Sequence, residues 1–157
     1  MKPRLYLETT IPSYLAAKPS RDLRLAADQL TTQEWWARRR GDFHLFVSDA
    51  VIEEVRQGDP AAATARLAVV QGLSVLDETP MATALAKRLL GEGIIPAVAG
   101  TDALHLALAA AHDVDFLLTW NCRHLNNRAL ERRILRACEA CGLTCPVICT
   151  PMELMVF

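Results

Sequence analysis

Polar side chains follow two apolar runs that have the length of buried strands. Residues 5–7 are followed by Glu8, and residues 116–118 are followed by Thr119, Trp120 and Asn121. Ligands of open α/β sheets bind beyond the carboxyl ends of the strands, so these side chains are placed for a cleft. Neither Glu8 nor Asn121 has a lysine beside it. The pattern predicts a divalent-cation site, and a solvated strand end is the alternative for Glu8.

Two adjacent glutamates lie in the helix expected after the second strand. At about 100° per residue, Val51, Ile52 and Val55 define the buried direction of this helix. Glu54 falls on the shoulder of that buried face, whereas Glu53 points nearly opposite to it. Glu54 is therefore the candidate site residue, and Glu53 is expected to face solvent.

Asp102 lies in the first turn of an almost wholly apolar helix that Gly100 and Thr101 open. It could serve the cleft, or it could only compensate the helix dipole. His105 follows three residues later on the same face. It could orient Asp102, contact a phosphate, or be a structural histidine between helices.

The segment after residue 118 carries the next candidates. Asn121 could ligate a metal through its carbonyl oxygen or hold the turn, and Arg123 and His124 follow it as candidate substrate contacts. Further along, Arg128, Arg132 and Arg136 recur every four residues and form one helical stripe. A solvated helix face is the plain interpretation of this stripe, and a track for phosphates is the functional one.

Composition limits the class of protein. The 157 residues are 52% hydrophobic and 22% charged, as in globular proteins, and suit one domain, 1–157. The formal net charge of −1 does not indicate a nucleic-acid binder by itself. No apolar stretch approaches the roughly 20 residues that span a bilayer, and the N-terminus lacks signal-peptide features. A cytoplasmic protein is expected.

Five cysteines without a secretion signal predict reduced thiols. Four of them are clustered: Cys138, Cys141, Cys145 and Cys149. The first pair has the spacing of zinc ligands, but structural zinc sites usually separate their two ligand pairs by a longer excursion. Buried free cysteines at a helix end and on a short last strand are the favoured interpretation.

Hydrophobic periodicity predicts strands that alternate with helices. The strands are expected near 4–8, 43–47, 73–76, 116–119 and 147–148, and the helices at 12–17, 20–40, 49–57, 61–71, 80–91, 102–112 and up to 141. In the second helix, Ser20 is the expected N-cap, and Leu23, Ala26, Ala27 and Leu30 are the expected buried stripe. Strands separated by helices predict an α/β fold with a mostly parallel sheet covered on both faces.

The order of these motifs resembles the PIN domain, and within it the VapC-type toxins of bacterial toxin–antitoxin pairs. The resemblance rests on the acid after the first strand, on residues 54–58, 101–103 and 118–125, on the helix from 20–23 to Trp35 and Trp36, and on the ending 146–151. It covers nearly the whole chain and implies a three-layer α/β/α sandwich with a parallel sheet.

The resemblance further implies a Mg²⁺- or Mn²⁺-dependent endoribonuclease, commonly a homodimer, that a cognate antitoxin inhibits. Glu8, Glu54 and Asp102 match the metal-binding acids, and Asn121 stands where many members carry a fourth catalytic acid. Glu8 replaces the usual aspartate and is one methylene longer. The expected RNA contacts are Thr9, Arg123, His124, Arg128 and Arg132.

Chemistry and alternatives follow from the same residues. Crowded carboxylates repel one another, and a divalent ion relieves this repulsion, polarises a phosphoryl group and activates water. One alternative is a PIN-fold protein that binds RNA or a partner but cleaves poorly, because Glu8 and Asn121 depart from the usual acids. The other is a metal-dependent enzyme that acts on a small phosphorylated substrate, which the long arginine stripe disfavours.

Overall fold

The computed structural model describes residues 1–156, so that only Phe157 of the expected domain lies outside the described range. Five parallel strands form one sheet in the order β3-β2-β1-β4-β5. The strands are β1 (Arg4–Leu7), β2 (His44–Ser48), β3 (Ser74–Leu76), β4 (Phe116–Leu118) and β5 (Val147–Cys149). The parallel sheet expected from the sequence is confirmed, and β1 lies at its centre, where Tyr6 pairs with Phe46 on one side and Leu117 on the other.

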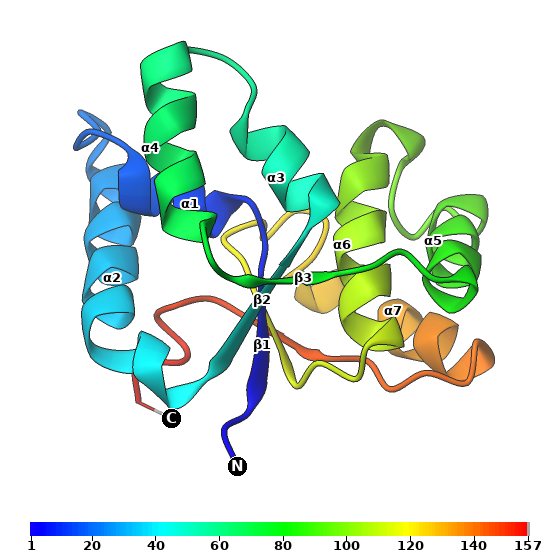
Figure 1. Ribbon diagram of the computed structural model, residues 1–157. Helices are drawn as coiled ribbons and strands as arrows, with labels where there is room; N and C mark the ends of the chain where they lie inside the picture. Colours follow the sequence, from blue (N-terminus) through cyan, green and yellow to red (C-terminus); the bar gives the residue numbers. More distant parts are fainter. Residues whose placement is uncertain (157) are drawn as a thin grey trace.

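Helices cover both faces of the sheet (Figure 1). They are α1 (Thr10–Ala16), α2 (Leu23–Arg39), α3 (Asp49–Val55), α4 (Pro60–Val70), α5 (Pro80–Gly91), α6 (Gly100–Ala111) and α7 (Arg128–Ala140), with short 3₁₀ turns at Arg40–Asp42 and Ala97–Ala99. Helix α1 packs against α2 and α4 on one side, and α5 packs against α6 and α7 on the other. The arrangement is the three-layer α/β/α sandwich expected from the sequence.

Local sequence explains where several helices begin. The Ser48 hydroxyl accepts the N–H of Val51 and caps α3, as its position before the helix predicts. The expected N-cap of α2 was wrong. Asp22, and not Ser20, accepts the N–H groups of Arg24 and Leu25, while the Ser20 hydroxyl accepts the N–H of Asp22. Helix α2 therefore starts two to three residues later than expected.

The buried face of α2 also differs from the expected stripe. Leu23 and Leu30 are 86% and 66% exposed, whereas Gln29, Thr32 and Trp35 are buried. Polar contacts decide this rotation, since Gln29 accepts the N–H of Ser20, and the Thr32 hydroxyl receives the indole N–H of Trp120 at 2.7 Å. The face of α2 that carries these hydrogen-bonding side chains therefore packs inward, and the face that carries the two leucines is left at the surface.

The core holds the functional end of the sheet in place. Residues Leu5, Tyr6 and Leu7 of β1 are fully buried, as are most side chains of α6 between Ala103 and Ala110. The chain leaves β1 toward β2 and later returns on the other side of β1 as β4. The loops after β1 and β4 therefore part at the carboxyl edge of the sheet, which is the position of ligand clefts in such folds.

Candidate functional site: three carboxylates at the carboxyl edge of the sheet

The ends of β1 and β4 are joined directly at this edge. The N–H of Glu8 donates to the carbonyl of Leu118 at 3.1 Å, which extends the β1–β4 pairing by one residue. Thr119, the first residue after β4, is fully buried and donates its hydroxyl proton to Glu8 Oε1 at 2.7 Å. The two segments that the sequence singled out therefore meet in space.

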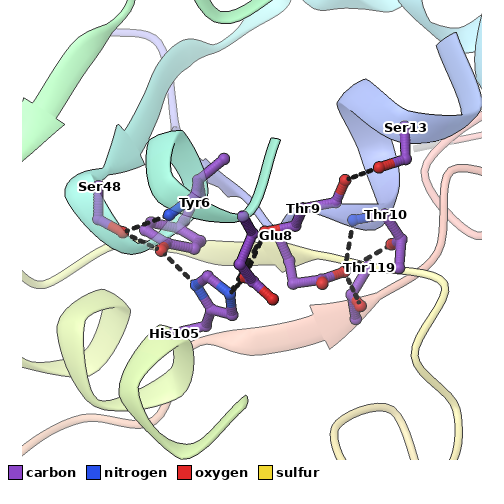
Figure 2. Close-up of polar contacts among 10 residues, drawn as sticks. Tyr6, Glu8, Thr9, Thr10, Ser13, Ser48, His105 and Thr119 are labelled. Carbon is purple, nitrogen blue, oxygen red and sulfur yellow. Dashed lines mark hydrogen bonds and ion pairs between the residues drawn. The ribbon is translucent and has the colours of Figure 1, made fainter. Parts of the chain in front are cut away.

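Glu8 is almost completely buried, with 4% of its surface exposed. Its Oε1 accepts the N–H of Thr10 at 3.1 Å, the hydroxyl of Thr10 at 2.5 Å and the hydroxyl of Thr119. Figure 2 shows these two threonines converging on Glu8. Within residues 1–156, its Oε2 accepts no hydrogen bond. The solvated strand end does not describe Glu8, whose neutral partners fix one oxygen and leave the other available.

Glu54 reaches the same edge from α3. Its Oε1 accepts the hydroxyl of Thr9 and the Nε2–H of His105, both at 2.6 Å, and a third of its side chain remains exposed. Burial alone raises the pKa of Glu54, but the hydrogen bonds from His105 and Thr9 outweigh burial and lower it below its usual value. Glu53 is exposed and pairs with Arg56 at 3.4 Å. The helix geometry predicted this difference between the two glutamates correctly.

Asp102 is half-buried in the first turn of α6. Burial raises its pKa above the usual value, and the negative charge of Glu54 adds to the increase. A hydrogen bond from the Asn121 side chain and the nearby rings of His105 and His124 only partly oppose this shift. Asp102 and Glu54 thus lie close enough for their negative charges to repel each other.

Asn121 holds the turn after β4. Its carbonyl oxygen accepts the N–H of Arg123 at 3.2 Å and that of His124 at 3.0 Å, and its side chain lies close enough to Asp102 to lower the pKa of that carboxyl. The sequence left two roles open for Asn121, metal ligation and holding the turn, and these hydrogen bonds correspond to the second. Arg123 is exposed, whereas His124 is half-buried and lies close enough to Asp102 to lower the pKa of that carboxyl.

The sequence singled out His105 and Thr119 without predicting the partners they have at this edge, and it missed Tyr6. His105 is fully buried and bonds Tyr6 and Glu54 instead of orienting Asp102. Tyr6 is joined in turn to Ser48, and Thr119 holds Glu8. A tyrosine inside an otherwise aliphatic strand was the one available signal, because a buried hydroxyl requires a partner.

The arginine stripe lies on α7 and leads away from this edge. Because α7 connects the parallel strands β4 and β5, it runs back from the carboxyl toward the amino edge of the sheet. Arg128 begins the helix, and Arg136 lies two turns, about 12 Å, further along its axis. Arg128 pairs with Glu131 at 2.8 Å and with Glu153 at 3.9 Å. The part of the stripe nearest the carboxylates is therefore the start of α7.

No preassembled metal cluster is present in residues 1–156, where no three His, Cys, Asp or Glu side chains are grouped closely enough to hold an ion. The carboxylates of Glu8, Glu54 and Asp102 are instead held apart by separate hydrogen-bond donors. The clustered cysteines are free thiols, of which Cys138 and Cys149 are buried. No described helix is both long and apolar enough to cross a membrane.

Comparison with known proteins adds a likeness of fold. No protein-family model matches the chain, and a search of curated proteins found no match. A chain in the crystal structure of VapBC2 from Rickettsia felis bound to a DNA fragment from their promoter is similar, with a TM-score of 0.54 and 16% sequence identity. The likeness covers 93% of this chain and 97% of that chain. The chain therefore has the PIN-like fold that the sequence predicted.

Proposed function

We propose that this protein is a Mg²⁺- or Mn²⁺-dependent endoribonuclease. The observation that carries the proposal is that the end of β1, α3 and α6 bring Glu8, Glu54 and Asp102 to one edge of the sheet, where the loops after β1 and β4 part. Within residues 1–156, no lysine or arginine forms an ion pair with any of the three. Three carboxylates that share a cleft without a basic partner suit a divalent cation.

The donor set fits a hard divalent ion. Every candidate ligand is an oxygen, and Glu8 and Glu54 each keep an Oε2 that accepts no hydrogen bond from the described residues. Mg²⁺ commonly uses one or two carboxylates together with waters and phosphate oxygens, so a closed protein cage is not needed. When bound, the ion polarises the phosphoryl group and activates water for attack.

The chain's own residues then have distinct roles. Glu54 and Asp102 repel each other in the free protein, so that ion binding relieves a strain already present. Thr10 and Thr119 both donate to Oε1 of Glu8, and this restraint orients the other carboxylate oxygen, Oε2. Asn121 acts in catalysis by holding Asp102 through its amide group.

RNA is the proposed substrate because basic and polar side chains surround the exit of β4. Arg123 and His124 flank the carboxylates, and α7 begins with Arg128, followed by Arg132 one turn later. Thr9 adds a hydroxyl on the other side, although in the free protein its proton is donated to Glu54. These residues would contact phosphates and sugars, which positions a strand without reading its sequence.

The proposed biological role is that of the toxin in a cytoplasmic toxin–antitoxin pair, and the antitoxin partner provides the test of this role. The similar solved chain comes from the VapBC2 structure, which supports a cognate antitoxin for this chain, and we propose that the toxin itself is a homodimer. Co-expression with the product of a neighbouring small reading frame should suppress the toxicity of this chain and yield a co-purifying complex. Toxicity that no neighbouring product suppresses would contradict the pairing.

Cleavage of a single-stranded RNA by the purified protein tests the enzymatic proposal. Activity should require Mg²⁺ or Mn²⁺, disappear with a chelator and be lost in Asp102→Asn, while Glu53→Gln should retain it, since Glu53 faces solvent. Full activity in Asp102→Asn would refute the assignment.

One observation favours a second candidate, a PIN-fold protein that binds RNA without efficient cleavage. The three carboxylates are not preassembled, and Glu8 is buried under three hydrogen bonds. Metal-independent RNA binding without cleavage at any metal concentration would select this candidate over the nuclease.

A further inference from the structure

A continuous line of hydrogen bonds runs through the core to Glu54. The Ser48 hydroxyl bonds the Tyr6 hydroxyl at 2.7 Å, the Tyr6 hydroxyl bonds His105 Nδ1 at 2.7 Å, and His105 Nε2 bonds Glu54 Oε1 at 2.6 Å. Figure 2 shows Ser48 and Tyr6 on one side of the His105 ring. The line crosses from β2 through β1 to α6 and ends on α3. It therefore ties four elements to a single carboxylate.

The chemistry of Glu54 fixes the direction of the last bond. An ionised carboxylate can only accept a hydrogen bond, so in the 2.6 Å contact with Oε1 of Glu54 the donor is Nε2–H of His105. The Tyr6 hydroxyl then faces the other ring nitrogen. Because Tyr6 and His105 are fully buried and their rings are in contact, with centroids 5.7 Å apart, the ring has little freedom to turn.

We propose that His105 is a positioning residue that holds Oε1 of Glu54 and leaves Oε2 facing the cleft, with Tyr6 and Ser48 fixing the ring. This inference rests on the proposed metal-dependent nuclease. Thr9 bonds the same oxygen as His105, so both donors restrain Oε1 and neither engages Oε2. A carboxylate restrained in this way presents one defined ligand atom, and it does not lose side-chain entropy when it binds an ion.

A buried histidine between helices is often only structural, and α3 and α6 do contact each other. Here, however, the line of bonds ends on a partly exposed carboxylate at the cleft and not on a backbone group. A structural tie alone would change the stability of the protein. Positioning would also change metal affinity and the mobility of Glu54, and these readouts separate the two roles.

The test compares variants that keep or remove the donor. His105→Gln retains an amide that can donate to Glu54, whereas His105→Leu removes the donor, and Tyr6→Phe removes only the hydroxyl that faces the ring. Mn²⁺ affinity, measured by calorimetry on folded protein, should fall about 10- to 100-fold in His105→Leu, as for other residues that orient metal ligands. It should change less than about threefold in His105→Gln, and Tyr6→Phe should lie between them.

Val70→Ala is the matched control for lost stability. Val70 is buried on α4 and forms no part of the site, so its truncation lowers the melting temperature without touching Glu54. This variant should bind Mn²⁺ as the parent does. Parent-like affinity in His105→Leu, or an equal loss of affinity in Val70→Ala, would overturn the positioning role.

A metal-free measurement keeps this inference separate from the proposed function. In protein with ¹³C-labelled glutamate, NMR relaxation should find the Glu54 side chain rigid and the solvent-facing Glu53 side chain mobile. In His105→Leu, Glu54 should become as mobile as Glu53. If the parent neither binds Mn²⁺ nor cleaves RNA while this change occurs, the nuclease proposal fails and the orientation of Glu54 by His105 stands. Unchanged rigidity of Glu54 in His105→Leu would refute the positioning role of His105.

Discussion

Thr119 and Glu8 connect the ends of two neighbouring strands, β4 and β1, at the carboxyl edge of the sheet. The Thr119 hydroxyl donates to Glu8 Oε1 at 2.7 Å and accepts the N–H of Asn121 at 2.9 Å. One buried hydroxyl thus links the acid after β1 to the turn after β4. Both bonds lie where solvent cannot replace them, since Thr119 is fully buried.

Thr119→Val should therefore destabilise the protein, although valine has nearly the same shape. The substitution leaves the N–H of Asn121 without its acceptor and removes one donor from Glu8, and an unsatisfied buried polar group costs about 1–3 kcal/mol. Urea unfolding measures the loss. Thr119→Ser keeps the hydroxyl and should recover most of the stability. Equal stability of the valine variant and the parent would show that water satisfies both groups.

Asp102→Asn should make the metal-free protein more stable at pH 7. Because the pKa of Asp102 is raised in the folded state, the folded protein holds this proton more tightly than the unfolded chain. Stability therefore falls as pH rises from below the unfolded pKa through the folded one, and asparagine removes this penalty. Since Asp102 is only half-buried, solvent screening limits the gain to about 1 kcal/mol, or roughly 2–4 °C.

Thermal unfolding between pH 3 and pH 8 checks this expectation. The melting temperatures of Asp102→Asn and the parent should converge below about pH 3, where Asp102 is protonated in both states. A variant that is less stable than the parent at pH 7 would instead mean that the bond from Asn121 outweighs the burial of Asp102.

Glu54→Gln should have the opposite effect. The pKa of Glu54 is lowered in the folded state, so this group contributes stability above its unfolded pKa and loses it as pH falls through the folded value. Glutamine can still accept from Thr9 and His105, but as a neutral acceptor, so the loss at pH 7 should be about 1 kcal/mol. The same pH series measures it, and Glu53→Gln should leave the melting curve unchanged. A loss that persists at low pH would show a steric origin.

The sequence predicted the order of the elements and the inward direction of Glu54, because both follow from local periodicity. It failed for α2, where the apolar residues Leu23 and Leu30 are exposed and Gln29 is buried. Burial there depends on hydrogen bonds to Ser20 and the backbone of Lys18, which lie outside the helix. Periodicity within a helix carries no information about such partners.

His105 illustrates the same limit at the site. Its spacing from Asp102 correctly placed both on one helix, and it suggested an interaction between them. The packing of α6 against α3 instead directs the ring to Glu54, and the other ring nitrogen bonds Tyr6 of β1. The partner of a side chain on a neighbouring element depends on the tertiary arrangement. Neither the line of hydrogen bonds from Glu54 to Ser48 nor the separation of the three carboxylates could therefore be predicted from the sequence.

Arg128 and Arg132 should contribute unequally to RNA binding. In the Asp102→Asn background, each lost phosphate contact on a single strand lowers the slope of log affinity against log salt by roughly 0.7. Arg128 is already paired with Glu131 and Glu153, whereas Arg132 forms no ion pair within the described residues, so Arg132→Ala should reduce the slope more. Arg38→Ala, at an exposed arginine paired with Glu34 on α2, is the control. Identical slopes in all variants would leave the stripe as solvated surface.

Asn121→Asp should lower the stability of the metal-free protein and raise its affinity for metal. An aspartate can still accept the N–H groups of Arg123 and His124, so the turn survives, but an oxygen replaces the amide that donates to Asp102. At about 4 Å and an effective dielectric near 20, two unit charges repel by on the order of 4 kcal/mol before solvent screening. The metal-free variant should therefore melt below the parent.

Mn²⁺ distinguishes the two roles of Asn121, metal ligation and holding the turn. The added carboxylate repels Asp102 in the metal-free protein, but it attracts a dication bound beside Asp102. We expect saturating Mn²⁺ to raise the melting temperature of Asn121→Asp more than that of the parent, and calorimetry to resolve tighter binding, including a second event that the neutral amide does not support. If the variant melts lower than the parent both with and without Mn²⁺, and by the same amount, Asn121 serves the turn alone. The ion is then held by Glu8, Glu54 and Asp102 without a fourth ligand.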